Sequence, residues 1–150
     1  MFEDCHSLYS LDLSNFKTAN VSLMKYMFNR CYNLTFINIS NFNTSKVRKM
    51  DNMFNSCINL ITLNLSNFDT SNLISMENMF YNCNSLIYLN IYSFKITEGN
   101  NIPINNSFYG LNPNVTYCIH DEYTKYYLLK PDNYFICSDT CYKESNIIKD

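Results

Sequence analysis

Apolar and polar positions follow one another along this chain in a pattern that repeats every 26 residues. Within one period, apolar residues two apart, such as Leu11 and Leu13, are typical of one face of a β-strand. Further along, Val21, Met24 and Phe28 stand three or four residues apart, as on one face of a helix. Each period is therefore predicted to contain a strand, a turn and a short helix.

A period of about 20–50 residues is typical of stacked repeats, because one repeat cannot bury its apolar face alone. Strands joined in this way run parallel, with a right-handed crossover. We expect an α/β fold, a right-handed solenoid with short parallel strands and short helices. Residues 1–96 supply about four repeats, and residues 97–150 form an irregular connection and a small cysteine-containing C-terminal cap. We expect Val115–Ile119 to pair beside the strand at 88–91.

The repeat phrases resemble a known family. LDLSNFKTANVSLMKYMFNRC, INISNFNTSKVRKMDNMFNSC and LNLSNFDTSNLISMENMFYNC are similar to BspA-like leucine-rich repeats over about residues 1–95. The resemblance implies a leucine-rich-repeat solenoid in an extracellular or cell-surface adhesive or recognition protein, with varied ligands. It carries over no catalytic residues. The fourth copy departs from the pattern after Asn90, which implies that the array ends near residue 96.

Cysteine recurs with the same period, at the end of each Met-Phe-x-x-Cys phrase: Cys5, Cys31, Cys57 and Cys83. The repeat places every thiol at one inward corner, about 4.8 Å from its neighbour along the stack. We expect a buried ladder of thiols, since free cysteine packs as a small hydrophobe. Disulfides between adjacent coils and a metal site are the alternatives, and side chains that point the same way disfavour a bridge.

Three further cysteines, Cys118, Cys137 and Cys141, lie outside the period. Together with His120 they provide four potential zinc ligands, and Cys137 and Cys141 have a C-x3-C spacing. Cys118 and His120 are two positions apart without a second close pair, which disfavours zinc. In an extracellular protein we expect a disulfide from Cys118 to Cys137 or Cys141 instead, and no metal.

Strand residues that face away from the core form the predicted binding surface: Asp12, Phe36, Asn38, Thr62, Asn64, Tyr88 and Asn90. Aromatic side chains are enriched at binding hot spots, so Phe36 and Tyr88 are the predicted anchors. Two alternatives stay open. The asparagine row is equally consistent with a stacked amide ladder that stabilises the sheet, and Tyr88 is equally consistent with packing under the cap.

The composition argues against several classes of function. The net charge is only −2, and no apolar run approaches the roughly 18–20 residues of a membrane span, so we expect neither a nucleic-acid partner nor a spanning segment. Two glycines leave no Gly-rich phosphate loop, while 25 asparagines are suited to form the turns. His6 and His120 have no nucleophile at motif spacing, so we expect no enzymatic activity and no cofactor.

The leading hypothesis is a non-catalytic surface module that recognises a protein or glycan through its strand face. The alternatives are a structural spacer within a larger surface protein and an intracellular interaction scaffold. No signal peptide is visible. Met1 and Phe2 occupy the place of the Met-Phe pair of later repeats, so we expect the chain to be the C-terminal portion of a longer protein.

Overall fold

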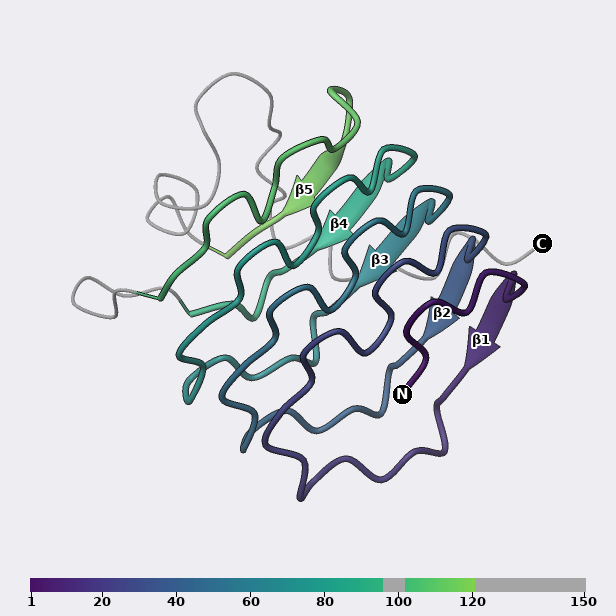
Figure 1. Ribbon diagram of the computed structural model, residues 1–150. Helices are drawn as coiled ribbons and strands as arrows, with labels where there is room; N and C mark the ends of the chain where they lie inside the picture. Colours follow the sequence, from purple (N-terminus) through teal and green to yellow (C-terminus); the bar gives the residue numbers. More distant parts are fainter. Residues whose placement is uncertain (96–101, 121–150) are drawn as a thin grey trace.

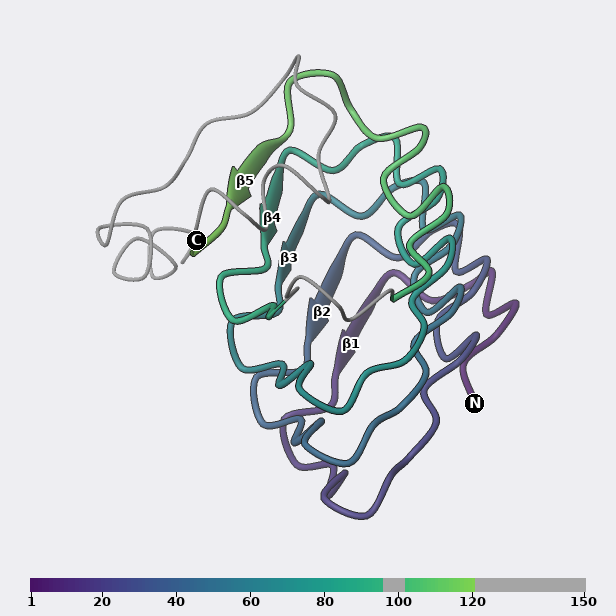
Figure 2. The same ribbon diagram turned by 90° about the vertical axis from the view of Figure 1, so that its left-hand side faces the viewer.

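The computed structural model of the protein describes residues 1–95 and 102–120. Within these ranges it contains five strands of three residues each: β1 (Ser10–Asp12), β2 (Phe36–Asn38), β3 (Thr62–Asn64), β4 (Tyr88–Asn90) and β5 (Thr116–Cys118). The strands lie side by side in chain order along one side of the molecule (Figure 1). The connecting turns fill the opposite side (Figure 2).

β1 pairs with β2, β3 with β4 and β4 with β5, each in parallel, which confirms the predicted direction of pairing. Ser10 pairs with Phe36, and Tyr88 pairs with Thr116, so the predicted pairing of the segment near 115–119 with the strand at 88–91 is also confirmed. β1 and β2 form one sheet, and β3, β4 and β5 form another. The described residues thus form a stack, with coil 1 at residues 6–31, coil 2 at 32–57, coil 3 at 58–83 and coil 4 at 84–95 and 102–111.

The prediction of an α/β, leucine-rich-repeat solenoid with short helices is wrong, because the described residues contain no helix. Where a helix was expected, the chain makes consecutive turns that bond to the next coil. The amides of Met24 and Phe28 donate to the carbonyls of Lys49 and Met53, each at 2.9 Å. These donors therefore serve contacts between coils and not a bond to the carbonyl four residues back.

Left-handed backbone explains why no helix forms here. Tyr26 and Arg30 have φ angles of 57° and 61°, which a right-handed helix does not contain. The same two places in later coils also have positive φ: Asn52, Ser56, Asn78, Asn82, Asn106 and Gly110. Asparagine tolerates this conformation better than most residues, so its recurrence was the sequence signal for a turn.

The interior is filled by columns of like side chains. Phe2, Phe28, Phe54 and Phe80 stack ring on ring, with neighbouring centroids 5.4–6.1 Å apart and nearly parallel planes. Phe108 extends this column, with its ring centroid 5.6 Å from that of Phe80. Because each ring is covered by the coils on either side, the stability of one coil depends on its neighbours.

The periodic geometry continues past residue 96. Phe108 follows Phe80 by 28 residues in the aromatic column, and Thr116 follows Tyr88 by the same interval in the sheet. Coil 4 is therefore two residues longer than the earlier coils. Residues 102–111 complete coil 4, and residues 112–120 carry the strand that begins the next one.

Candidate functional site

The polar row of the predicted binding surface forms hydrogen bonds within its own turns. In each coil the Oδ1 atom accepts from the amide two residues further on: Asp12 from Ser14 at 2.8 Å, Asn38 from Ser40 at 3.2 Å, Asn64 from Ser66 at 3.0 Å and Asn90 from Tyr92 at 3.0 Å. Hydrogen bonds from the Ser14 amide and hydroxyl lower the pKa of Asp12. These side chains therefore stabilise the turn that follows each strand.

Replacement of one member of this row tests that role. We expect Asn64→Ala to lower the free energy of unfolding by about 1 kcal/mol, because the Ser66 amide loses its acceptor. Asn64→Asp should retain most of the stability, since Asp12 makes the same bond in coil 1. Urea unfolding of the two variants measures this difference, and equal losses would contradict the turn bond.

Exposure along the predicted surface is lowest in coil 4. Phe36 is 53% exposed, whereas Thr62 and Tyr88 are partly buried. Asn90 is 1% exposed, so its placement on an exposed face was wrong. Tyr92 next to it accounts for this burial, since it stands where earlier coils have serine. Its amide donates to Asn90, and its ring packs edge-on against His120, with ring centroids 4.9 Å apart.

A second row of exposed residues was missed by sequence reasoning. Tyr9, Ile61 and Ile87 precede their strands by one residue and are 64%, 44% and 49% exposed. Thr35 holds the same place in coil 2, and its amide donates to the Tyr9 carbonyl at 2.8 Å. Strict alternation would turn this row inward with Leu11. The strands are only three residues long, however, and the alternation does not extend past their first residue.

Phe36 and this row together make an apolar band along the coils, defined as Tyr9, Phe36, Ile61 and Ile87. Backbone bonds hold Ile61 and Ile87 in register with Thr35, since the amide of Ile61 donates to the Thr35 carbonyl at 3.3 Å and that of Ile87 to the Ile61 carbonyl at 2.9 Å. Phe36 directly follows Thr35, at the place that Ser10 holds in coil 1. The only signal in the sequence was the apolar residue at the same place in three of four repeats.

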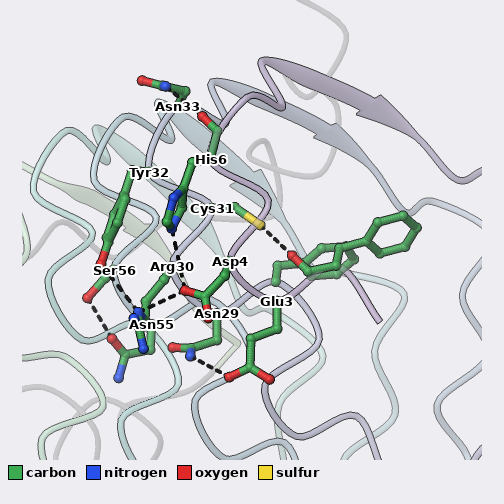
Figure 3. Close-up of polar contacts among 12 residues, drawn as sticks. Glu3, Asp4, His6, Asn29, Arg30, Cys31, Tyr32, Asn33, Asn55 and Ser56 are labelled. Atoms are coloured by element: carbon green, nitrogen blue, oxygen red, sulfur yellow. Dashed lines mark hydrogen bonds and ion pairs between the residues drawn. The ribbon is translucent and has the colours of Figure 1, made fainter.

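The periodic cysteines contact the backbone of the preceding coil. Cys31, Cys57 and Cys83 are buried free thiols, and their Sγ atoms donate to the carbonyls of Phe2, Phe28 and Phe54 at 2.9, 3.1 and 3.1 Å. Figure 3 shows the first of these contacts. Cys5 is partly exposed.

Burial changes the chemistry of these thiols. It raises the pKa of Cys31 to about 11 and that of Cys83 to about 12. Because the thiolate is the form that attacks disulfides and binds metals, protonated thiols of this kind are chemically inert at neutral pH. The ladder therefore contributes to packing between the coils.

The remaining candidate residues lie near the end of the described chain. Cys118 is buried, and burial raises its pKa despite a hydrogen bond with the Tyr88 hydroxyl. Cys137 and Cys141 lie outside the described residues, so the disulfide to Cys118 stays a prediction. Across residues 1–95 and 102–120, no group of three or more His, Cys, Asp and Glu side chains is placed to hold a metal ion.

The fold and its surface define a class of protein: a repeat protein of stacked coils joined by backbone ladders, with an exposed apolar band. The chain belongs to the family described as "Mycoplasma protein of unknown function, DUF285", whose model matches residues 1–113. No curated protein and no solved structure matches the chain. In the part that the structure describes, no helix has the length and apolar character needed to cross a membrane.

Proposed function

We propose that this chain is a non-catalytic recognition module that binds a protein partner through the apolar band of Tyr9, Phe36, Ile61 and Ile87. The carrying observation is the exposure of these four large side chains, each 44–64%, on consecutive coils of one face. Scattered exposed apolar residues are ordinary, whereas a contiguous band with polar neighbours is typical of an interaction surface.

The neighbours of the band favour a protein ligand. The adjacent polar row of Asp12, Asn38 and Asn64 already bonds to its own turns, which leaves fewer free acceptors for sugar hydroxyls. Aromatic and aliphatic side chains held in register provide rigid anchors with little conformational entropy to lose on binding. A glycan ligand is the alternative within the same function. Placement at the cell surface rests on the resemblance of the repeat phrases.

A structural spacer is the second candidate function. The observation that favours it is the use of the polar row in turn bonds, which gives those side chains a role without any ligand. A spacer would bind no partner through the apolar band, so removal of the band would change no binding. The two functions therefore differ in whether partner binding depends on the band.

An array of purified extracellular proteins and glycans, probed with the labelled full chain, tests the proposal. We expect protein spots to bind the chain, and the double variant Phe36→Ala with Ile61→Ala to bind them at least about tenfold more weakly, a loss of about 1.4 kcal/mol. The matched control is Ile74→Ala with Tyr109→Ala, which removes exposed apolar side chains from other rows.

Each outcome of the array decides between the candidates. Binding lost in the Phe36 and Ile61 variant and kept in the control supports the proposal. Equal binding by both variants contradicts the apolar band as the site. Binding to glycan spots alone favours the glycan alternative, and an array without any bound spot favours the spacer. Circular dichroism of each variant shows that the fold is kept.

A further inference from the structure

Three basic residues stand close together in the connection from β2 to β3: Lys46, Arg48 and Lys49. Val47 between them is 0% exposed, whereas Lys46 and Arg48 are exposed and Lys49 is partly exposed. The buried valine fixes the segment to the core, so the three cations belong to its outer surface, and we call them the basic row. The connections between the strands lie away from the strands and from the apolar band (Figure 2).

Backbone contacts to the coils on both sides hold the basic row in place. The Arg48 amide donates to the Ser22 carbonyl, and the Ile74 amide donates to the Arg48 carbonyl, each at 2.8 Å. Lys49 forms parallel β-bridges with Leu23 and Ser75. Described coils therefore cover coil 2 on both sides, and the basic row is a feature of the lateral surface of the stack.

The repeats show that the fold does not require these charges. The counterparts of the basic row in coils 1 and 3 are all uncharged: Asn20 and Asn72 for Lys46, Ser22 and Ile74 for Arg48, and Leu23 and Ser75 for Lys49. The same backbone contacts thus form without charge at these places. Stacking of the coils does not account for three cations on one segment.

Among the described residues, no carboxylate forms an ion pair with the basic row. Lys46 donates to Oδ1 of Asn20 at 3.0 Å, a neutral partner that leaves its charge in place. Three uncompensated cations on one short segment create a positive local potential, although the net charge of the chain is −2. The acidic side chains of the adjacent segments have other partners: Asp51 lies 3.3 Å from Nζ of Lys25, Glu77 accepts from Asn105 at 3.2 Å, and Asp69 accepts from the Ser71 amide at 2.9 Å.

We propose that the basic row binds a linear acidic glycan, through the sulfate or carboxylate groups of the sugar chain. Lysine and arginine form charge-assisted hydrogen bonds with such anions. The cations lie along one coil with uncharged counterparts on both sides, so they form a line, which fits an anionic chain. An anionic membrane surface would be matched better by cations spread over several coils. The site is separate from the apolar band and goes beyond the function proposed for it.

The residues beside the basic row favour a sugar chain over a nucleic acid. Asn20, Ser22 and Asn72 flank it with amide and hydroxyl groups, the kind of group that hydrogen-bonds to sugar hydroxyls. None of its counterparts in coils 1 and 3 is aromatic, whereas proteins that bind single-stranded nucleic acids stack the bases on aromatic side chains. The chemistry of the row and its neighbours is therefore that of an acidic-glycan site.

Calorimetric titration of the full chain with heparin, a sulfated glycan, and with hyaluronate, which carries carboxylates only, tests this proposal. We expect heparin to bind at about 150 mM salt, and Arg48→Ser with Lys49→Ser to weaken binding at least about tenfold, because two of three charge contacts are lost. Ser22 and Ser75 hold these places in the adjacent coils, so the fold should be kept. The matched control, Lys17→Asn with Lys95→Asn, removes the same charge at exposed places where coil 2 has Asn43.

The outcomes separate an acidic glycan from other anions. Binding that the Arg48 and Lys49 variant weakens and the control keeps supports the proposal, and hyaluronate shows whether carboxylates suffice. No binding of either glycan would overturn it, as would equal losses in both variants. Tighter binding to phosphatidylserine vesicles or to single-stranded DNA would overturn the choice of a glycan. Phe36→Ala with Ile61→Ala should bind heparin as the unmodified chain does, so this test is independent of the apolar band.

Discussion

Phe54→Ala is expected to lower the free energy of unfolding by about 3–5 kcal/mol, because it removes a ring from the centre of the aromatic column. Phe54 is fully buried, and its ring stacks on Phe28 at 5.4 Å and on Phe80 at 6.1 Å. Truncation leaves a cavity between two coils and removes both ring contacts. Because coils stabilise one another, the loss affects the neighbouring coils as well.

Urea unfolding followed by circular dichroism measures this effect. Phe54→Leu should cost clearly less than Phe54→Ala, because leucine fills much of the same volume. Ile58→Ala is the exposed control and should change the free energy of unfolding by about 0.5 kcal/mol or less. A loss below about 1 kcal/mol in Phe54→Ala would show that the aromatic column does not hold the coils together.

Asp51→Asn is expected to lower the free energy of unfolding by about 1.5–3 kcal/mol near neutral pH. Asp51 is buried, and its Oδ1 atom accepts from the Ser75 hydroxyl and from the Glu77 amide. Its Oδ2 atom lies 3.3 Å from Nζ of Lys25. The carboxylate thus joins coils 1, 2 and 3 through three charge-assisted contacts, which a neutral amide makes less well.

The contribution of Asp51 to the free energy of unfolding should decrease at acidic pH. Burial by itself raises the pKa of this carboxyl, but the hydrogen bonds from Ser75 and Glu77 and the Lys25 ammonium outweigh burial and lower it. The unfolded chain therefore binds a proton more readily than the folded one. The stabilisation is fully present above the unfolded value of about 3.9 and is lost as the pH falls through the lowered folded value.

Urea unfolding of the wild-type chain and Asp51→Asn, from about pH 7 down to about pH 2.5, measures this dependence. The difference between them should be constant at neutral pH and shrink at acidic pH. Ser75→Ala should reproduce part of the loss, because it removes one donor to the carboxylate. A difference that is the same at every pH would contradict a stabilising charge at Asp51.

The sequence predicted the parallel pairing of the strands and their positions. Leu11 and its counterparts, two residues from the next apolar position, mark strands because successive side chains in a strand alternate between faces. The recurrence of these residues at 26-residue intervals requires each strand to lie beside its counterpart. The alternation of Val115, Tyr117 and Ile119 predicted a further strand, and the structure pairs this strand, β5, with β4.

The candidate surface was predictable only in part. Phe36 is exposed as expected, whereas Asn90 is buried and Tyr9, Ile61 and Ile87 were not anticipated. Alternation assigns a side chain to a face only within a strand. Each strand here has three residues, so the orientation of the residue just before it depends on how the chain turns into the sheet.

By itself, the sequence determined the length of the repeat and the recurring leucine, methionine and phenylalanine positions that form the interior, because buried apolar residues recur at the repeat period. It did not determine the structure of the segment from Val21 to Phe28, since spacings of three and four suit both a helix and a series of tight turns. Only the tertiary structure decided between them. The adjacent coil offers carbonyls to Met24 and Phe28, and the left-handed backbone at Tyr26 turns these amides toward it.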